Sequence, residues 1–307
     1  MKRVIALGFF DGVHVGHRAL LDVAKMRAQA RNCTATALTF DPHPNALIFG
    51  EKTPLINTLE ERRLLMTEQY RMDEMLVLPF DRAFMELDWQ EFVKEVLVKR
   101  FEAVHLVCGF DYTFGHRGLG NAQNLQSLCK ELGLGCDVVN KVELLGTEVS
   151  SSRIRVLLEQ GRVEEANALL GHPHFVSGTV THGKKLGRIL GFPTANLPLG
   201  EDRVVPVRGV YATRVVCGDS VYASVTNVGS RPTVGRSTQI TLESHLLDFA
   251  GDLYGKTITV EFETFLRPET KFASVEELTA AIRQDAASAR MFFAETKKRT
   301  HRERYGC

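Results

Sequence analysis

The sequence predicts an α/β domain built on a parallel sheet, followed by a small antiparallel β-barrel domain that ends in a helix. In the first half, apolar runs of strand length alternate with segments whose apolar residues recur at helical spacing, which is typical of a parallel sheet covered by helices. In the second half, short alternating runs are separated by turn residues, as in a barrel. The composition changes at His172-Pro173, where proline disfavours a continued helix. We therefore expect domains at residues 1–172 and 173–307.

The bulk composition limits the classes of protein and partner. A chain of 307 residues is long enough for two domains with separate cores. Its net charge of +1 creates no general field for nucleic acid or for an anionic membrane, and we expect neither as a partner. None of the six cysteines forms a C-x-x-C pair, so neither a zinc site nor a disulfide framework is predicted. With no leader peptide or membrane span expected, we predict a cytoplasmic protein with reduced thiols. The oligomeric state stays open.

The elements of the first half follow from its periodicity. For example, residues 4–7 form an apolar run of strand length, and the apolar residues within segment 17–31 recur at helical spacing. Three polar or glycine-rich loops, at residues 8–17, 41–44 and 109–115, each follow a strand, so they should meet at one edge of the sheet. Strands are expected at residues 4–9, 34–40, 75–78, 104–108 and 136–139, and helices at residues 17–31, 59–72, 89–101, 121–132 and 156–170, the last ending at Gly171.

The second half predicts short strands and one long helix. A helix at residues 275–293 is amphipathic and should pack on the barrel through Leu278, Ile282, Ala286 and Phe293. The basic tail at residues 297–304 is interpreted as a solvated end because the whole chain is almost neutral. Strands are expected at residues 175–181, 209–216, 221–228, 239–246 and 257–266.

The segment Gly8-Phe9-Phe10-Asp11-Gly12-Val13-His14-Val15-Gly16-His17 joins the first strand to the first helix. Such a loop presents helix N-terminal amides to an anion. His14 and His17 are three residues apart, hence on one face if the helix has begun. Two imidazoles beside free amides suit oxygens that gain negative charge in phosphoryl or nucleotidyl transfer. The alternative is that one histidine caps the helix and the other is an ordinary core or surface residue.

The run Asp-Gly-Val-His-Val-Gly-His resembles the H-x-G-H signature of the nucleotidyltransferase superfamily. The resemblance implies a Rossmann-like fold and transfer of AMP from ATP, with His14 and His17 steadying the phosphates. The run Val-Ser-Ser-Ser-Arg-Ile-Arg at residues 149–155 resembles the I-S-S-T-x-I-R segment of the prokaryotic FAD synthetase domain, with Ser152 in place of threonine. By itself that segment is also explained by a plain helix cap with surface arginines.

The resemblance to the FAD synthetase domain assigns roles in the first half. Arg153 joins the two histidines as a catalytic residue. The loop at residues 109–115 resembles the family's G-x-D/N-F-x-F-G loop, which places Asp111 near the flavin together with Asp41 of the preceding loop. The residues assigned to nucleotide binding are Gly8, Phe9, Asp11, Gly16, Ser150, Ser151, Ser152 and Arg155.

The second half has its own group of candidate residues. Thr194 and Asn196 lie two apart, so in an extended segment their oxygens share a face, and such hard neutral ligands suit Mg²⁺. A turn after Pro193 is the alternative. Together with residues 178–188 and Glu243, the P-T-x-N run resembles the riboflavin kinase domain, in which it holds Mg-ATP and a strand glutamate is the base.

That resemblance makes residues 183–188 a glycine-hinged lid over ATP, with Gly183, Lys184, Gly187 and Arg188 as nucleotide ligands. The same stretch is not a P-loop, because Lys185 stands where serine or threonine should follow the lysine and because the stretch lies in a β segment. Asp285 and Arg290, on the last helix, are assigned to the flavin ring, with a surface ion pair between them as the alternative.

Taken together, the chain resembles the bacterial family of bifunctional riboflavin kinase/FAD synthetases over essentially its whole length. The resemblance implies phosphorylation of riboflavin to FMN and adenylylation of FMN to FAD, with Mg²⁺, two molecules of ATP, and flavins as substrate and product. Two other functions stay open: adenylylation of another phosphorylated cofactor precursor, and a second half that binds flavin without catalysis.

Overall fold

The computed structural model describes the chain except for residues 51–52, 145, 184–189, 201, 233–237 and 306–307; of residues 231–232, 238 and 297–305 only the backbone is considered. It divides into two compact units, Met1–Arg153 and Ile154–Cys307. Each unit is described by itself. The expected domain limits, 1–172 and 173–307, stay a prediction.

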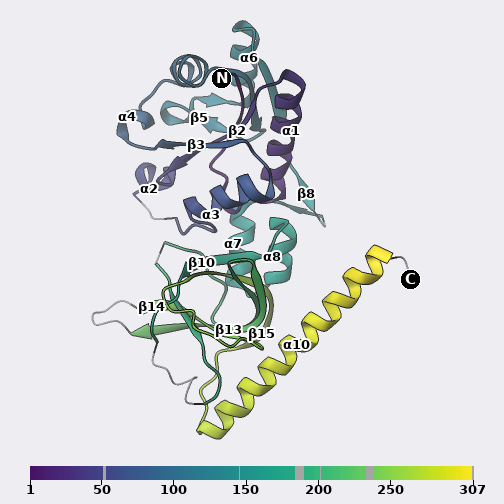
Figure 1. The fold of residues 1–307 in the computed structure, drawn as a ribbon. Coiled ribbons are helices and arrows are strands. Elements are labelled where there is room, and N and C mark those ends of the chain that lie inside the picture. The colour runs from purple at the N-terminus through teal and green to yellow at the C-terminus, as the bar shows by residue number, and fades with distance from the viewer. Residues whose placement is uncertain (51–52, 145, 184–189, 201, 233–237, 306–307) are drawn as a thin grey trace. The chain divides into compact units, whose positions relative to one another are not determined.

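The first unit is built on a five-stranded, all-parallel sheet in the order β3-β2-β1-β4-β7. β2 and β3 of this sheet are labelled in Figure 1. All five predicted strands are present. β1 and β4 are neighbours, although the chain passes from β1 to β2 on the other side, so the topological switch point lies between them. The strands are β1 (Arg3–Leu7), β2 (Thr34–Asp41), β3 (Glu74–Pro79), β4 (Ala103–Gly109) and β7 (Gly135–Val139).

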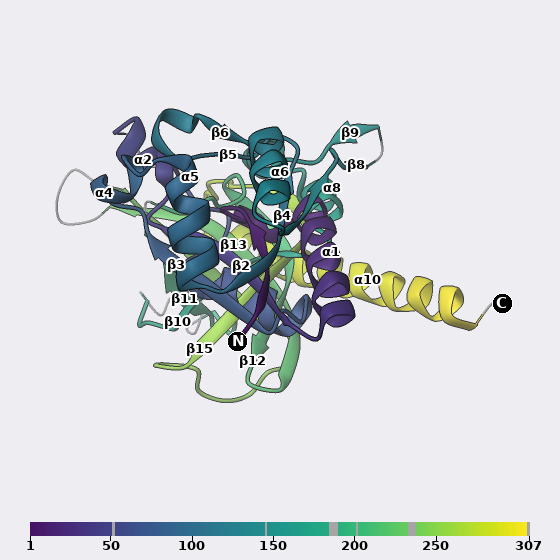
Figure 2. The same ribbon diagram turned by 90° about the horizontal axis from the view of Figure 1, so that it is seen from above.

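Helices connect these strands and bury the sheet. Side chains of β1 alternate in direction: Ile5 and Leu7 join the core formed with Phe92 and Leu125, whereas Val4 and Ala6 are buried on the other face. The connecting helices are α1 (Val15–Arg31), α2 (Pro44–Ile48), α3 (Leu59–Leu64) with the π-helical η2 (Leu65–Gln69), α4 (Arg82–Met85), α5 (Trp89–Glu91) with η3 (Phe92–Arg100), and α6 (Ala122–Glu131) (Figure 2). Also present are the short 3-10 helices η1 (Asp11–Val13) and η4 (His116–Gly118), and two small pairs of strands that the sequence did not predict, β5 (Thr113–Phe114) with β6 (Gly120–Asn121) and β8 (Glu143–Leu144) with β9 (Thr147–Glu148).

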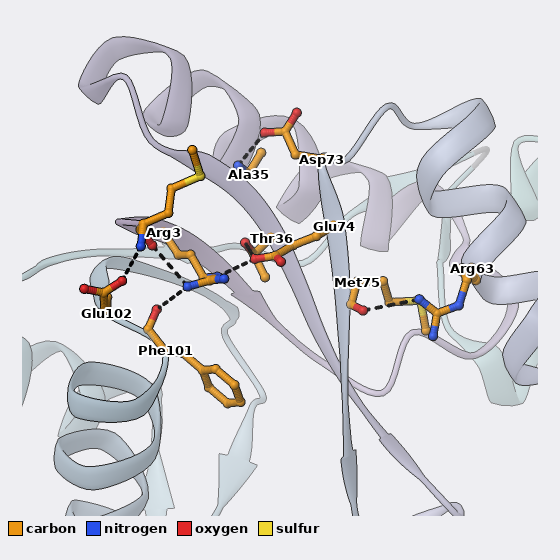
Figure 3. Close-up of polar contacts among 10 residues, drawn as sticks. Arg3, Ala35, Thr36, Arg63, Asp73, Glu74, Met75, Phe101 and Glu102 are labelled. Carbon is orange, nitrogen blue, oxygen red and sulfur yellow. Dashed lines mark hydrogen bonds and ion pairs between the residues drawn. The ribbon is translucent and has the colours of Figure 1, made fainter.

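Polar contacts connect β1, β2 and β3 near their amino ends (Figure 3). Arg3 forms an ion pair with Glu74 and donates to the carbonyl of Phe101 at 3.2 Å. Glu74 also accepts from the hydroxyl of Thr36 at 2.8 Å. The contacts tie β1, β2 and β3 at the edge of the sheet opposite to the one where ligands bind in such folds.

The second unit is a six-stranded antiparallel barrel in the order β10-β15-β12-β13-β14-β11. A bridge between Thr181 and Asn196 brings the chain beyond β10 against β11, so the sheet is nearly closed. The predicted barrel is therefore confirmed. Its strands are β10 (His174–Thr179), β11 (Ala195–Pro198), β12 (Gly209–Cys217), β13 (Ser220–Pro232), β14 (Thr238–Leu246) and β15 (Thr257–Pro268).

The expected single helix at residues 156–170 is wrong. The chain forms α7 (Ser151–Glu159) and α8 (Val163–Leu170), separated at Gly161, whose φ of +73° is a left-handed conformation that ends a helix. α8 ends at Gly171, as predicted. Asn167 of α8 donates to the carbonyl of Phe262 at 2.8 Å and accepts from the backbone of His174 at 2.7 Å. These bonds fix α8 to the barrel.

The last helix, α10 (Val275–Tyr305), is longer than predicted and contacts β12, β13 and β15 (yellow in Figure 1). Ala289 is fully buried and Asp285 almost so. The four side chains expected to pack, Leu278, Ile282, Ala286 and Phe293, are half-buried. The packed face is therefore the predicted one, with a buried carboxylate in its middle. In the described residues, we find no helix with the length and apolar character needed to cross a membrane.

Candidate active sites

A cavity of about 580 Å³ opens at the carboxyl edge of the sheet in the first unit. The loops after β1, β2 and β4 all contribute to its wall, which confirms that the three loops share one edge. The start of α7 completes the wall. Among the predicted site residues, those that line the cavity are Gly8, Phe9, His14, Gly16, His17, Asp111, Ser150, Ser151 and Ser152.

The two histidines lie against each other. His14 precedes α1 as its N-cap, and its Nδ1 accepts a hydrogen bond from the backbone N–H of His17 at 3.2 Å. The two rings stack with their centroids 3.6 Å apart and their planes 12° apart. We expected His14 and His17 to share one face of the helix. Instead, His14 lies just before the helix as its N-cap, and its ring stacks on that of His17. His14 caps the helix, yet both rings line the cavity, so capping does not exclude a role in binding.

The surroundings of His17 keep its imidazole neutral. Burial, the neighbouring His14 and the cation of Arg62 together lower the pKa of His17 well below its ordinary value. Its Nδ1 is buried and has no hydrogen-bond partner among the described residues. A buried polar atom without a partner is uncommon, and this one belongs to a ring that faces a cavity. The ring is thus available to a ligand that accepts or donates one hydrogen bond.

The three serines at the start of α7 act partly as caps. The hydroxyl of Ser150 accepts from the backbone N–H of Arg153 at 3.2 Å, and the hydroxyl of Ser151 donates to the carbonyl of Asp11 at 2.9 Å. Ser152 is exposed at the cavity. Nε of Arg153 is buried with no partner in the described part of the chain, although the residue is not among those that line the cavity. Arg155 belongs to the second unit, and its role stays a prediction.

Two of the predicted aspartates lie differently from the rest. The carboxylate of Asp11 is buried and accepts from the backbone N–H groups of Ile56 and Asn57, at 2.9 and 3.3 Å. Asp41 is exposed. Neither is among the described residues of the cavity wall. Their predicted roles toward nucleotide and flavin therefore gain no support from the geometry, whereas Asp111 does lie at the cavity.

One wall of this cavity is aromatic, a feature that the sequence analysis missed. The rings of Phe40, Phe80 and Phe84 lie within 5.8 Å of one another, measured between centroids, and Phe84 in turn meets Phe92. The signal in the sequence was the Phe-Asp-Arg-Ala-Phe run at residues 80–84, directly after the third strand. The cavity therefore has a polar end at the histidines and an apolar side suited to a flat ring.

Two cavities, of about 520 and 260 Å³, are found among the described residues of the second unit. Thr194 lines both of them. Asn196 and Gly183 line the larger cavity, and Glu243 lines the smaller. The predicted kinase residues thus lie where the two cavities meet. Lys184, Gly187 and Arg188 fall outside the described residues.

The strand register explains why these side chains meet. Asn196 of β11 pairs with Glu243 of β14, which pairs with Asn227 of β13. Residues directly paired across antiparallel strands point to the same face of the sheet. The amide of Asn196 donates to the carbonyl of Thr194 at 3.3 Å. At Gly183 a β-carbon would lie only 2.6 Å from that amide, so a larger residue there would force the Asn196 side chain to shift.

The donor set fits a magnesium ion bound together with phosphate. Thr194 supplies a hydroxyl oxygen and Asn196 an amide oxygen, both of them hard neutral ligands. Within the described residues we find no cluster of three or more histidine, cysteine, aspartate or glutamate side chains that could hold a metal ion. Mg²⁺ characteristically takes its remaining ligands from water and substrate phosphates, which agrees with so sparse a set.

Comparison with known proteins matches both units. The FAD synthetase family model matches residues 1–153, and the riboflavin kinase model matches residues 170–293. The bifunctional riboflavin kinase/FMN adenylyltransferase of Bacillus subtilis is 37% identical over 97% of this chain and 94% of that protein. The protein of the same name from Escherichia coli K12 is 40% identical over 96% of this chain and 94% of its own length. The chain belongs to the bifunctional riboflavin kinase/FMN adenylyltransferase family.

A solved structure supports the fold assignment. A crystal structure titled as a macrolide-efflux protein from Streptococcus pneumoniae is 32% identical and covers 94% of each chain, with a TM-score of 0.84. Its title names another activity, whereas the two family models and the related proteins agree with one another. In this family, then, the parallel-sheet unit corresponds to FAD synthetase and the barrel to riboflavin kinase.

In the riboflavin kinase half, the expected alternative of a surface ion pair between Asp285 and Arg290 is wrong. Asp285 instead accepts two hydrogen bonds from Arg267, at 2.9 and 2.8 Å, and lines the smaller cavity. Arg290 pairs with Asp248, at 2.6 and 2.8 Å. Each finds its partner on the barrel because the two residues are five apart, which places them on different sides of the helix. A role toward flavin stays a prediction for both, and only Asp285 lies at a cavity.

Proposed function

We propose that the two units of this chain catalyse two consecutive steps. The barrel transfers the γ-phosphate of ATP to riboflavin and gives FMN. The parallel-sheet unit joins FMN to AMP from a second ATP and gives FAD and pyrophosphate. The proposal is carried by one observation: two separate sets of cavities, in two units matched by two family models, each contain the polar groups that one of these steps requires.

For the adenylyl step, the cavity of the first unit has a place for each part of the substrates. The N-terminal amides of α1, together with His14 and His17, would bind the phosphates of ATP. Since His17 is neutral, it can donate to a phosphoryl oxygen as negative charge develops there. The serines at the start of α7 and the guanidinium of Arg153 would hold the remaining phosphate oxygens. The aromatic wall fits the flavin ring.

For the kinase step, the larger cavity of the barrel would bind ATP and the smaller one riboflavin. Glu243 lies in the smaller cavity and would accept the proton from the riboflavin hydroxyl that attacks the γ-phosphate. Thr194 and Asn196 would hold Mg²⁺, which supplies charge neutralisation at the phosphates. Neither step requires a covalent intermediate on the protein; both depend on placing two substrates in line.

The localisation and the partners of the protein are inferred from its cysteines and its net charge. We place the protein in the cytoplasm, because Cys33, Cys108, Cys129, Cys136 and Cys217 are free thiols. Its partners are the small molecules of the two reactions, and the net charge of +1 gives no reason to expect nucleic acid.

The direct test is to incubate the purified protein with riboflavin, ATP and MgCl₂ and to separate the flavins by chromatography over time. We expect FMN to appear first and FAD to follow, both dependent on Mg²⁺. Adenylylation of another precursor is tested in parallel with labelled ATP and phosphopantetheine or nicotinamide mononucleotide. Riboflavin that stays unchanged would refute the kinase assignment, and FMN that accumulates without FAD would refute the adenylyl assignment.

A further inference from the structure

Arg62 of α3 is completely buried in the first unit and lies outside every role assigned above. Among the described residues, it is the largest of the fully buried side chains. Arginine is almost never fully buried unless its charge is paired. Its sequence context, Glu-Glu-Arg-Arg at residues 60–63, is typical of a solvated helix face and gave no sign of this burial.

The guanidinium of Arg62 holds the first residues of the histidine loop. Its Nη1 donates to the carbonyl of Phe9 and to the hydroxyl of Thr39, both at 2.7 Å. The hydroxyl of Thr39 donates to the same carbonyl of Phe9 at 2.7 Å. The guanidinium carbon also lies 4.3 Å from the centre of the Phe9 ring, a cation–π geometry. Phe9 lines the cavity, so Arg62 fixes one of its walls from behind.

The charge of Arg62 has no counter-ion in contact. In the described part of the chain, its Nε and Nη2 are buried without hydrogen-bond partners, and no ion pair that includes Arg62 is found there. Asp11, Asp41 and Glu60 act on it only from farther away, and the carboxylate of Asp11 is engaged by the amides of Ile56 and Asn57. Because a guanidinium keeps its proton in proteins, the positive charge remains and its field is directed at its surroundings.

The positive charge of Arg62 is one of the groups that act on His17. His14 stacks on its ring, Phe10 meets it edge-on with centroids 5.2 Å apart, and Arg62 acts on it electrostatically. The carboxylate of Asp11 belongs to the same loop. After burial and His14, Arg62 is the third contribution that lowers the pKa of His17.

We infer that Arg62 is a positioning residue for the adenylyl step, which holds the Phe9 wall of the cavity and directs a fixed positive charge to the histidine end where phosphate binds. The inference rests on the proposed function of this cavity. Arg62 acts through Phe9 and His17 and does not itself contact substrate. Its unpaired charge favours phosphate binding and keeps the neighbouring imidazole in its neutral form.

The test compares three variants of the full-length protein: Arg62→Met, Arg62→Lys and Arg63→Met. The last is a matched control, because Arg63 is the next residue of the same helix and is exposed. FMN adenylylation is measured from pH 5 to pH 9, with kcat and KM for ATP, and riboflavin phosphorylation by the same preparation reports on the integrity of the protein.

For Arg62→Met we expect kcat/KM for ATP to fall by a factor of about ten or more, as after loss of one charge-assisted interaction. The acid limb of the pH profile should move to higher pH, since without the cation the pKa of His17 rises and the ring is protonated closer to neutrality. Arg62→Lys should keep the acid limb in place and recover part of the activity. Arg63→Met and the kinase reaction should be unchanged.

A purely structural role predicts a different result. Arg62→Met and Arg62→Lys would then lose activity equally, and the acid limb of the pH profile would not shift. This outcome overturns the inference, and so do unchanged kinetics in Arg62→Met. If Arg62→Met does not fold, Thr39→Val removes the two hydrogen bonds of the Thr39 hydroxyl and leaves the charge of Arg62; a shifted acid limb in that variant also overturns the inference. Parental protein that makes no FAD refutes the proposed function, whereas FAD formation insensitive to Arg62 refutes only this inference.

Discussion

The cavities of the two units differ in the polarity of the groups that they present. In the parallel-sheet unit, the cavity gathers donors and positive charge: helix amides, a neutral imidazole and the field of a buried guanidinium. In the barrel, Thr194, Asn196 and Glu243 gather acceptor oxygens where two cavities meet. A site of donors stabilises negative charge on leaving phosphates, whereas a site of acceptors holds a cation and removes a proton. Under the proposed function, the two units would therefore treat the same substrate, ATP, in opposite ways.

Replacing Glu243 should show the difference between the two units most strongly. Replacement by glutamine keeps the shape of the side chain and removes the base. We expect riboflavin phosphorylation to fall by a factor of about 10²–10⁴, the usual contribution of a general base, while conversion of added FMN to FAD continues at the parental rate. Both rates are measured by chromatography of the flavins. Glu295→Gln, an exposed position on α10, serves as control. Loss of both activities would show that the units are not chemically independent.

His17 should give the reverse result. Its replacement by alanine removes a donor from the polar end of the first cavity, and we expect FMN adenylylation to fall by about 10²–10³ with riboflavin phosphorylation unaffected. Pyrophosphate release gives a second readout of the same step. His116→Asn, whose ring is not among those described in the cavity wall, is the control. A variant that makes FAD from FMN at the parental rate would disprove the phosphate role of His17.

The sequence predicted the sheet and the barrel because both depend on local pattern, whereas most site residues were assigned from the family resemblance and their roles stay predictions. The strands show in apolar periodicity, and the histidines follow directly from the strand-to-helix loop. What it missed depends on distant contacts. The partners of Asp285 and Arg290 are Arg267 and Asp248, which no helical spacing indicates.

Other features were missed because local signals are ambiguous. The break at Gly161 was missed because an isolated glycine is often tolerated within a helical pattern. Asp11 was assigned to nucleotide binding from its place in the motif; that role stays a prediction, and the motif did not show that its carboxylate accepts from two backbone amides. Arg62 was overlooked because a charge run usually marks a solvated face. For Asp11 and Arg62 the deciding property is burial, which belongs to the folded chain and not to the local sequence.

A smaller effect on the kinase reaction is expected when the close approach between Gly183 and the Asn196 side chain is changed. In Gly183→Ala the new methyl group would lie 2.6 Å from the Asn196 amide, so this side chain must shift. We expect kcat/KM for ATP in the kinase reaction to fall by roughly tenfold, an order expected for a displaced ligand that is not lost. Gly178→Ala is the control, because its methyl group would meet only the flexible Leu197, at 3.3 Å. Equal kinetics in the two variants would argue against a role for Asn196 in binding the nucleotide.

The two ion pairs of α10 should differ in their contribution to stability. The side chain of Asp285 is 7% exposed, so Arg267→Met leaves a carboxylate buried without its partner and should lower the free energy of unfolding by roughly 3 kcal/mol. The pair of Arg290 with Asp248 is 52% and 75% exposed, so Arg290→Met should lower it by less than about 1 kcal/mol. Urea unfolding monitored by circular dichroism measures both. Since Arg267 and Asp285 both line the smaller cavity, whereas Arg290 and Asp248 are not among its described residues, Arg267→Met should also raise the KM for riboflavin; an unchanged KM would separate the helix anchor from the flavin site.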